Sequence, residues 1–384
     1  MTITQPSVVS TSTSQETLPD SRVPDLLLHR EQVRRILVIK LRHFGDVLLT
    51  TPLFSTLRAN YPNALIDVLV YDGTEAMLAG NRDIHQAYTV DRSLKRQGFK
   101  AQYRGEKALW DSLRTHHYDL VLNLSDQWRA ALYCRFLQPT FSLGLCYPKR
   151  DNRLWQACHS LLVAVDGQQQ HTVLNILSIL APLALPTIIT KVTMAYRQRD
   201  IEVVDQLSQR NNLTSFVLIQ PTARWAFKTW SVAGFTQVIN HLTREGETVV
   251  LTGGRSADEI AMITAILAGC TMPQRVVNLA GSLELPELAV LIDRAKLFIG
   301  VDSVPMHMAA ALQTPSVVLF GPSNLAQWSP WQAPHIRLWA GDYRPLPQPN
   351  EIDTDTPERY LEAIPTSDVI HAIKQQLMCQ KPSA

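Results

Sequence analysis

Short apolar runs alternate with helical stretches along most of this chain, and this alternation limits the possible folds more than any other feature. Runs typical of strands cover residues 34–40, 64–71 and 118–125, and each leads into a stretch with helical periodicity. An alternation of strands and helices predicts a parallel sheet with helices on both faces. The first half of the chain is therefore expected to form one α/β domain.

The second half repeats the pattern after residues 175–189, where Pro182 and Pro186 favour a domain boundary. Its strand-like runs cover residues 214–221, 247–254, 276–281, 296–303 and 316–323. A chain of 384 residues is long enough for two domains of roughly 100–200 residues each. The predicted fold class is α/β, with two Rossmann-like domains. Ligands bind at the carboxyl ends of parallel strands, so we expect the two sheets to face a central cleft.

Four segments are expected along the chain. Residues 1–32 begin with a Ser/Thr-rich stretch that has no basic cluster before an apolar core, which predicts a disordered polar tail and not a secretory signal. Residues 33–185 and 198–355 are the two Rossmann-like domains. Residues 356–384 contain an amphipathic helix that we expect to pack at the domain junction.

The composition excludes several classes of protein. With 46% hydrophobic residues, 18% charged residues and a net charge of +2, the chain does not resemble a bulk nucleic-acid binder. Residues 31–180 nevertheless hold 18 Lys and Arg against 13 Asp and Glu, which suits an anionic partner for the N-terminal half. The five cysteines form no CxxC pair, which favours a reducing compartment. No apolar run approaches the ~18–20 residues of a transmembrane helix.

The stretch IKLRHFGDVLLTTP at 39–52 places one carboxylate, Asp46, in a basic loop between a strand and a helix. Asp46 is either a helix N-cap or part of a reaction centre. Thr51 and Pro52 can themselves begin the following helix, which would leave Asp46 in the loop. An ionised carboxylate there could accept a proton from an attacking hydroxyl.

Two further stretches carry cations or phosphate-binding features at strand ends. In FVLIQPTARWAFKTWS, Arg224 and Lys228 are suited to a diphosphate and to charge on a phosphate leaving group. In FIGVDSVPMHMAAAL, Asp302 and Ser303 end a strand just before a helix whose exposed amides suit a phosphate. Asp302 is better suited to sugar hydroxyls, and His307 in the first helical turn is expected to touch the ligand.

Other catalytic motifs are absent from the sequence. No GxGxxG follows the first strand, and the chain has no GxxxxGK[ST] or HExxH motif. A P-loop and a zinc site are therefore unsupported, and we expect no metal.

Three segments together resemble the bacterial lipopolysaccharide core heptosyltransferases. They are KLRHFGDVLLTTPLFSTLRANYPNA, the Lys-Thr-Trp element at 228–230, and GVDSVPMHMAAAL followed by FGPS. These form glycosyltransferase family 9, which has the GT-B architecture, and the resemblance covers residues 34 to about 377. KLRHFGD followed by LLTTP is most similar to the heptosyltransferase III branch. The resemblance implies inverting transfer of heptose from ADP-L-glycero-β-D-manno-heptose to the second heptose of the inner core, with no cofactor.

The resemblance also assigns roles to residues. Asp46 matches the proposed general base, and the N-terminal domain would bind the acceptor. In the C-terminal domain, the family's donor-site positions are matched by Lys228, Gly281, Asp302, Ser303 and His307. The predicted donor site also includes four residues at or near strand ends, which are Thr222, Arg224, Gly254 and Gly321. Asp258 and Glu259 are candidates for the acidic ribose ligand. The acceptor is anionic, and its possible contacts are Lys40, Arg42, His43, Lys149 and Arg150.

The expected partners are ADP-heptose, the lipopolysaccharide inner core and the inner-membrane surface, with no nucleic acid. The enzyme is expected in the cytoplasm, held peripherally on the cytoplasmic face of the inner membrane. Three alternatives stay open at this point. They are a type I or II heptosyltransferase with a different acceptor, a GT-B-like sugar-nucleotide epimerase, and a non-catalytic sugar-binding protein, which would not need Asp46.

Overall fold

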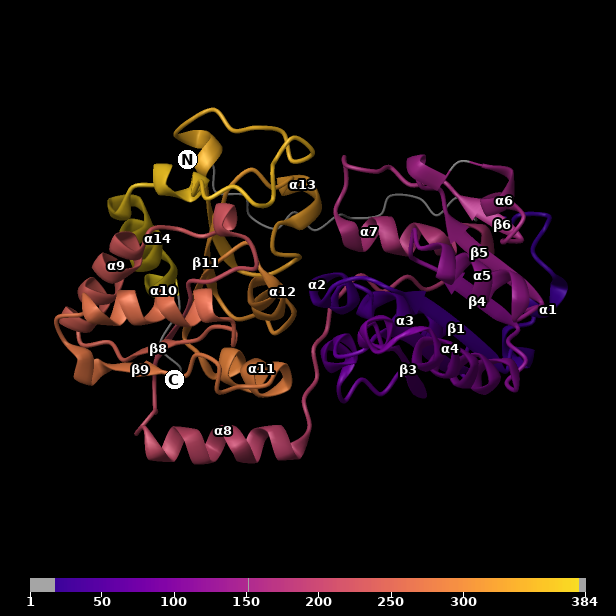
Figure 1. The fold of residues 1–384 in the computed structure, drawn as a ribbon, viewed down its shortest axis with the longest axis horizontal. Helices are drawn as coiled ribbons and strands as arrows, with labels where there is room; N and C mark the ends of the chain where they lie inside the picture. The colour runs from indigo at the N-terminus through magenta and orange to yellow at the C-terminus, as the bar shows by residue number, and fades with distance from the viewer. Residues whose placement is uncertain (1–17, 151, 380–384) are drawn as a thin grey trace. The chain divides into compact units, whose positions relative to one another are not determined.

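A computed structural model describes residues 18–150 and 152–379 of the chain. The chain divides into two compact units at residue 192. In the described residues, each unit contains one six-stranded sheet whose neighbouring strands are all parallel (Figure 1). The predicted α/β class with two parallel sheets is confirmed. The predicted domain limits and the cleft stay predictions.

The first unit is built around strands that follow the order β3-β2-β1-β4-β5-β6 across the sheet. The strands are β1 Arg35–Lys40, β2 Leu65–Tyr71, β3 Gln86–Val90, β4 Leu120–Asn123, β5 Phe141–Leu145 and β6 Leu161–Val163. The helices are α1 Asp25–Leu28, α2 Phe44–Leu48, α3 Thr51–Asn60, α4 Phe99–Arg114, α5 Trp128–Phe136, α6 Arg153–Gln156 and α7 Thr172–Leu177.

The second unit has the strand order β12-β11-β10-β7-β8-β9. Its strands are β7 Val217–Gln220, β8 Val249–Leu251, β9 Val276–Asn278, β10 Leu297–Val301, β11 Ser316–Phe320 and β12 His335–Trp339. Its helices are α8 Gln198–Arg210, α9 Val232–Arg244, α10 Ala257–Ala268, α11 Leu285–Arg294, α12 Val304–Ala311, α13 Leu325–Trp328 and α14 Thr366–Met378.

Part of the expected N-terminal tail is ordered. Residues 1–17 lie outside the described residues, but residues 18–32 contain α1 and a 3-10 helix at Arg30–Gln32. Leu27 is buried, and the hydroxyl of Tyr61 donates a hydrogen bond to its carbonyl oxygen at 3.3 Å. The prediction of disorder is wrong for residues 18–32, because buried apolar side chains such as Leu27 anchor them to the first unit.

One core of the first unit lies between its sheet and two helices. Leu37 and Ile39 of β1 and Val121 of β4 are fully buried and belong to the same cluster as Leu113 of α4 and Tyr133 of α5. Strands that are buried on both faces in this way appear in the sequence as continuous apolar runs. The central strands were for this reason the easiest to predict.

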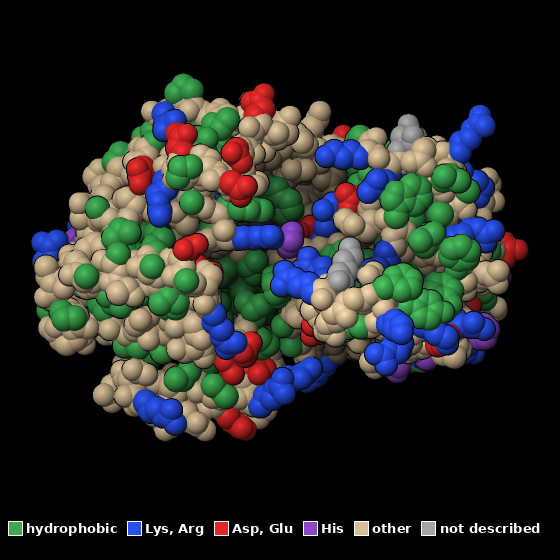
Figure 2. Space-filling model, viewed as in Figure 1, with side chains coloured by type: hydrophobic (Ala, Val, Ile, Leu, Met, Phe, Trp, Pro, Cys, Tyr) green, Lys and Arg blue, Asp and Glu red, His purple; other side chains and the backbone are tan. Residues whose placement is uncertain are grey.

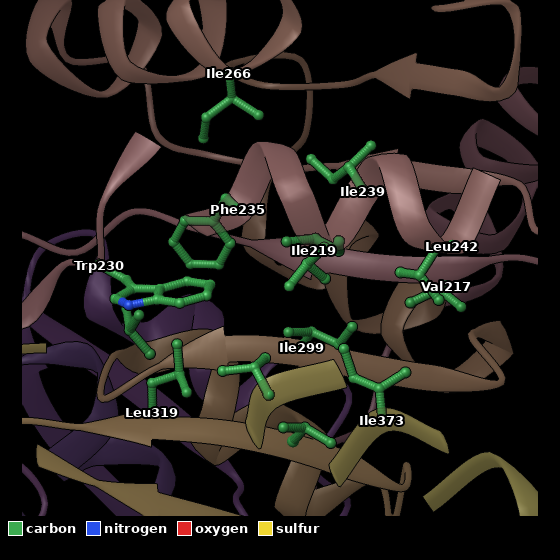
Figure 3. Close-up of a cluster of buried hydrophobic side chains, with 14 of the residues drawn as sticks. Val217, Ile219, Trp230, Phe235, Ile239, Leu242, Ile266, Ile299, Leu319 and Ile373 are labelled. Carbon is green, nitrogen blue, oxygen red and sulfur yellow. The ribbon is translucent and has the colours of Figure 1, made fainter. Parts of the chain in front are cut away.

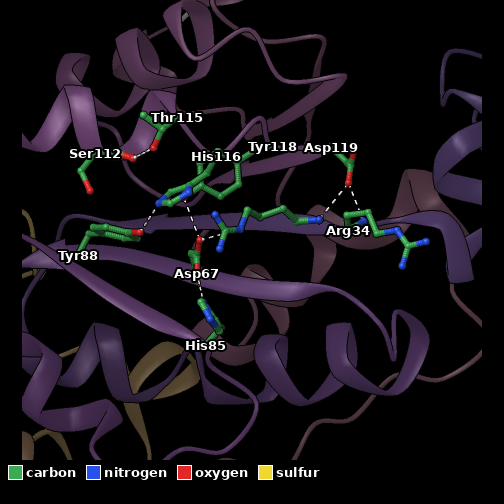
Figure 4. Close-up of polar contacts among 10 residues, drawn as sticks. Arg34, Asp67, His85, Tyr88, Ser112, Thr115, His116, Tyr118 and Asp119 are labelled. Carbon is green, nitrogen blue, oxygen red and sulfur yellow. Dashed lines mark hydrogen bonds and ion pairs between the residues drawn. The ribbon is translucent and has the colours of Figure 1, made fainter.

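A polar cluster lies near the amino ends of β1 to β4 (Figure 4). Asp67 is fully buried, and its carboxylate accepts a hydrogen bond from the hydroxyl of Tyr118 at 3.0 Å. Nδ1 of His85 lies 3.0 Å from the same carboxylate, and Nε of Arg35 lies 3.6 Å from it. A buried carboxylate needs such partners to offset its desolvation. We assign this cluster a structural role, because ligands bind at the opposite, carboxyl edge of parallel sheets.

The second unit has an apolar core on its sheet (Figure 3). The ring of Trp230 meets that of Phe235 edge-on, with centroids 5.2 Å apart. Nε1 of Trp230 donates a hydrogen bond to the carbonyl oxygen of Ile364 at 3.2 Å. The final helix, α14, buries Val369 and Ile373 in this core and contacts α9, β11 and β12. These contacts all lie within the second unit.

Among the residues that the structure describes, no helix is both long and apolar enough to cross a membrane. All five cysteines are free thiols.

Candidate functional site

Asp46 lies in a helix and not in the loop where it was expected. β1 ends at Lys40, and α2 begins at Phe44 with His43 as its N-cap. Asp46 is the third residue of α2, so it is not the N-cap. The expectation of a loop at Asp46 is wrong because the first helical turn begins earlier than Thr51, at Phe44. The expected helix from Thr51 is nevertheless present as α3, with Pro52 in its first turn.

The nearest cation to Asp46 is the buried side chain of Lys40. The Nζ atom of Lys40 lies 3.7 Å from Oδ1 of Asp46, whose side chain is 21% exposed. Burial lowers the pKa of Lys40, and the neighbouring Asp46 carboxylate only partly opposes that effect. The carboxylate therefore faces a desolvated amine on one side and stays open to solvent on the other. This arrangement suits a group that accepts a proton from a bound hydroxyl.

Arg42 and Arg150 both contact Asp126, a residue that the sequence analysis did not identify. The guanidinium of Arg42 lies 3.0 Å from the carboxylate of Asp126, just after β4. Nε of Arg150 donates a hydrogen bond to the carbonyl oxygen of Asp126 at 2.7 Å. The same guanidinium lies over the rings of Trp128 and Trp155, 5.8 and 5.9 Å from their centroids. Asp126 thus joins the ends of β1, β4 and β5 into one basic edge.

The other two candidate acceptor residues, His43 and Lys149, are exposed near these strand ends. His43 precedes α2, and Lys149 belongs to a 3-10 helix at Pro148–Arg150. The first unit therefore brings Lys40, Arg42, Arg150 and Asp46 to one edge of its sheet.

A buried chain of hydrogen bonds connects this edge to His159. The backbone amide of Leu41 donates to Oγ of Ser125 at 2.6 Å, and the amide of Ser125 donates to Oδ1 of Asn123 at 2.9 Å. That contact orients the Asn123 side chain so that its Nδ2 donates to Nε2 of His159 at 3.0 Å. Nδ1 of His159, which then carries the proton, donates to the carbonyl oxygen of Trp155 at 2.9 Å. These hydrogen bonds hold the backbone of Leu41, which is the residue after Lys40.

The buried hydrogen bonds of His159 predict that the stability of the protein depends on pH. Burial lowers the pKa of His159 below its ordinary value of about 6.5, although the bond to Trp155 opposes the shift. Because the pKa of His159 is depressed in the folded state, neutral His159 contributes fully to the free energy of unfolding above pH ~6.5. This contribution is lost as the pH falls through the folded-state pKa. His159→Gln should therefore flatten the decline of the free energy of unfolding between pH 7 and pH 5, by up to ~1.4 kcal/mol per pH unit. Denaturant unfolding at several pH values measures this slope.

His29→Gln is the matched control, because His29 is exposed. It should leave the slope as in the wild type. Equal slopes for His159→Gln and the wild type would mean that His159 does not titrate differently on folding.

In the second unit, Lys228 and Asp302 form an ion pair at the carboxyl ends of neighbouring strands. Lys228 ends a 3-10 helix that follows β7, and Asp302 directly follows β10. Nζ of Lys228 lies 2.6 Å from Oδ2 of Asp302, and the two side chains are 19% and 6% exposed. Oγ of Ser323, after β11, donates to the same carboxylate oxygen. Burial raises the pKa of Asp302, but the ammonium of Lys228 and the Ser323 hydroxyl outweigh it and hold the pKa below its ordinary value.

Ser303 and His307 occupy the start of α12 as predicted. Ser303 is the N-cap, Pro305 lies in the first turn, and His307 is buried with its ring edge-on to Trp328. The Oγ atom of Ser303 is buried and has no hydrogen-bond partner among the described residues. A buried hydroxyl of this kind at a helix N-terminus is suited to a phosphate oxygen, which the backbone amides there also favour.

Arg224 and Lys228 lie around one aromatic ring. The Arg224 guanidinium is 5.3 Å and Lys228 Nζ is 5.4 Å from the ring centroid of Trp225. Trp225 in turn stacks on Phe227, which is buried. The aromatic pair thus holds two cations near the end of β7, where the sequence predicted a diphosphate.

Thr222 and Gly254 both donate hydrogen bonds to Glu259, one of the two candidates for the acidic ribose ligand. Oγ1 of Thr222 donates to Oε2 of Glu259 at 2.5 Å, and the amide of Gly254 donates to the same oxygen at 2.8 Å. A Cβ at residue 254 would lie 2.4 Å from Oε1 of Glu259, so a larger residue there would displace this carboxylate. Asp258, the other ribose candidate, lies in the first turn of α10.

Gly281 and Gly321 differ in what surrounds them. Gly281, after β9, has a φ of +71°, and its amide donates to the carbonyl oxygen of Gly253 at 2.9 Å. Gly321, after β11, faces a buried side chain, since a Cβ there would lie 2.8 Å from Cδ1 of Leu361. Gly281 thus belongs to the edge near Gly254, whereas the space beside Gly321 is filled by the core.

The predicted donor residues therefore form two groups along one sheet edge, with β7 between them. Lys228, Asp302, Ser303 and His307 lie on the β10 side, and Thr222, Gly254 and Gly281 lie on the β8 side. The described part of the chain contains no group of three His, Cys, Asp or Glu side chains that could hold a metal ion.

The chain is similar in sequence to known heptosyltransferases. The profile of glycosyltransferase family 9 (heptosyltransferase) matches residues 107–356. Lipopolysaccharide heptosyltransferase 3 of Escherichia coli K12 is 40% identical over 349 residues, which cover 90% of this chain and 98% of that protein.

Two solved structures share the fold. A glycosyltransferase family 9 protein from Veillonella parvula matches with a TM-score of 0.78 and 21% identity, over 90% of this chain and 98% of its own. The ADP-heptose lipopolysaccharide heptosyltransferase II of E. coli matches with a TM-score of 0.70 and 22% identity, over 90% and 99%. They confirm the predicted GT-B architecture. From the family profile and the near full-length relative, we conclude that the chain belongs to glycosyltransferase family 9, the heptosyltransferases.

Proposed function

We propose that this protein transfers L-glycero-D-manno-heptose from ADP-L-glycero-β-D-manno-heptose to the second heptose of the lipopolysaccharide inner core, as a heptosyltransferase III. The observation that carries the proposal is the similarity to lipopolysaccharide heptosyltransferase 3 over nearly the whole of both chains. The reaction inverts the configuration of the donor sugar, which needs one displacement and one base.

Asp46 is the proposed base. Its carboxylate takes the proton of the acceptor hydroxyl while that oxygen forms a bond to the anomeric carbon of the heptose. The bond from this carbon to the diphosphate oxygen breaks, and ADP leaves with the electron pair. The support for this role is the position of Asp46 in the first turn of α2, partly open to solvent and beside the buried amine of Lys40.

The proposed donor site uses the two groups at the edge of the second sheet. Lys228, with Arg224, offsets the charge that develops on the leaving diphosphate. The Ser303 hydroxyl and the amides that begin α12 bind a phosphate oxygen, and Asp302 accepts hydrogen bonds from sugar hydroxyls. Gly254 and Gly281 let the backbone approach the nucleoside closely.

The proposed acceptor site is the basic edge of the first unit. Lys40, Arg42, His43, Lys149 and Arg150 suit the phosphate and acidic-sugar groups of an inner core. Because that acceptor is anchored in lipid, we place the enzyme in the cytoplasm, bound peripherally to the inner membrane.

The test is to incubate the purified protein with ADP-heptose and each of two core acceptors, one ending at the first heptose and one at the second. Release of ADP and a mass gain of one heptose on the second acceptor alone would support the proposal. A gain on the shorter acceptor would assign a type II activity, because that acceptor already carries the first heptose. An altered ADP-sugar without transfer would point to an epimerase, and donor binding without turnover would point to a sugar-binding protein.

A further inference from the structure

Two large aromatic side chains are exposed at the start of α4. Phe99 is 82% exposed and Tyr103 is 59% exposed, although phenylalanine is among the residues most often buried in folded proteins. They are four residues apart, so they lie on the same face of the helix, and their rings stack with centroids 6.4 Å apart. Farther along the helix, Leu113 is buried in the core of the first unit. Only the first two turns of α4 present aromatic side chains outward.

Basic side chains surround this aromatic pair. Lys100 and Arg104 are exposed and, together with Phe99 and Tyr103, line a hollow on the surface. Figure 2 shows hydrophobic side chains bordered by Lys and Arg on the face of the first unit that carries α4 and α5. Within the described part of the chain, neither Lys100 nor Arg104 forms an ion pair.

The acidic residues of α4 are paired elsewhere. Asp111 pairs with Lys107, and Glu106 pairs with Arg129 of α5. The start of the helix therefore combines apolar rings with two cations that pair with no carboxylate of the described residues. That combination is typical of a surface that enters the headgroup region of an anionic bilayer, where aromatic rings insert and basic side chains contact phosphates.

The position of the pair also suits a lipid-anchored substrate. α4 follows β3, and a helix that follows a strand of a parallel sheet begins at the carboxyl edge of that sheet. Asp46 and Arg42 follow β1 at the same edge of the first unit. A bilayer that touches Phe99 and Tyr103 would present a lipid-linked acceptor to the edge that holds the proposed base.

We propose that Phe99, Lys100, Tyr103 and Arg104 form a docking surface for an anionic lipid bilayer. The inference deepens the proposed function and rests on it for its biological sense, because the acceptor is lipid-linked. Binding to vesicles can nevertheless be measured without donor or acceptor, so the two proposals can fail separately.

The experiment is flotation of the full-length protein with vesicles of phosphatidylethanolamine and phosphatidylglycerol, and with vesicles of phosphatidylcholine alone. The wild type should bind the anionic vesicles and not the neutral ones. Lys100→Glu/Arg104→Glu should weaken binding by about tenfold or more, since each basic side chain near the surface contributes roughly fivefold. Phe99→Ser/Tyr103→Ser should lose the vesicle binding that remains at high salt, because salt screens the charges but not the insertion of the aromatic rings.

Arg199→Glu/Arg210→Glu on α8 is the matched control, with the same change of net charge on exposed arginines of the other unit. It should bind as the wild type does. All variants should keep the wild-type midpoint of denaturant unfolding, which shows that they are folded. Loss of vesicle binding in the α8 variant to the same degree, unchanged binding in both α4 variants, or no wild-type binding at all would overturn the proposal.

Discussion

Asp46→Asn should lower kcat for heptose transfer by about 10²- to 10⁴-fold, the range expected for loss of a general base. The substitution keeps the size of the side chain but removes its ability to take a proton. Asp46 is not the N-cap of α2, and asparagine keeps an oxygen that can face the Lys40 amine, so the fold should be kept. Steady-state kinetics with the two-heptose acceptor measure the loss.

Two controls separate catalysis from binding. The dissociation constant of ADP-heptose, measured by calorimetry, should be unchanged, because the proposed donor residues are in the second unit. Asp126→Asn alters a nearby carboxylate that pairs with Arg42, so it should raise KM for the anionic acceptor with a smaller effect on kcat. A fall in kcat of less than about tenfold for Asp46→Asn would contradict its role as base.

Lys228→Met should reduce kcat by about 10²- to 10³-fold, because it removes a cation from the leaving diphosphate. It should also lower the free energy of unfolding by about 3–5 kcal/mol, since Asp302 would be left as a buried carboxylate without its cation. The two effects have different causes, and they are measured by steady-state kinetics and by denaturant unfolding.

The double variant Lys228→Met/Asp302→Asn distinguishes these causes. It removes both charges from the buried site, so most of the lost stability should return. Activity should not return, because the cation that offsets the charge on the leaving diphosphate is still missing. Recovery of activity together with stability would mean that Lys228 serves only to neutralise Asp302.

The sequence predicted the central strands well and the peripheral ones poorly. β1, β7 and β10 are continuous apolar runs because both faces of these strands are buried. β3, β5, β6 and β12 were not predicted. β3 is a half-exposed edge strand without a continuous apolar run, and β6 has only three residues. β5 contains Gly144, where a Cβ would lie 2.6 Å from the ring of His159. The glycine at this position is explained by that tertiary contact, and glycine is a weak signal for a strand in the sequence.

The candidate site shows a similar division. A strand-end position could be read from the sequence for Lys228, Asp302 and Ser303, because each follows an apolar run. Their pairing depends on β7 and β10 being neighbours, which is a property of the strand order. The contact between Thr222 and Glu259 spans 37 residues and likewise follows only from the tertiary fold, which brings the first turn of α10 to the end of β7. Asp126 was missed because it follows its strand without any motif.

The anomeric configuration and linkage of the reaction product test the central claim most directly. Nuclear magnetic resonance of the product formed from ADP-L-glycero-β-D-manno-heptose and the two-heptose acceptor gives both. We expect one new α-linked heptose on the second heptose, as a single displacement assisted by Asp46 requires. A β-linked product would demand a second displacement and a protein nucleophile, and it would contradict the account.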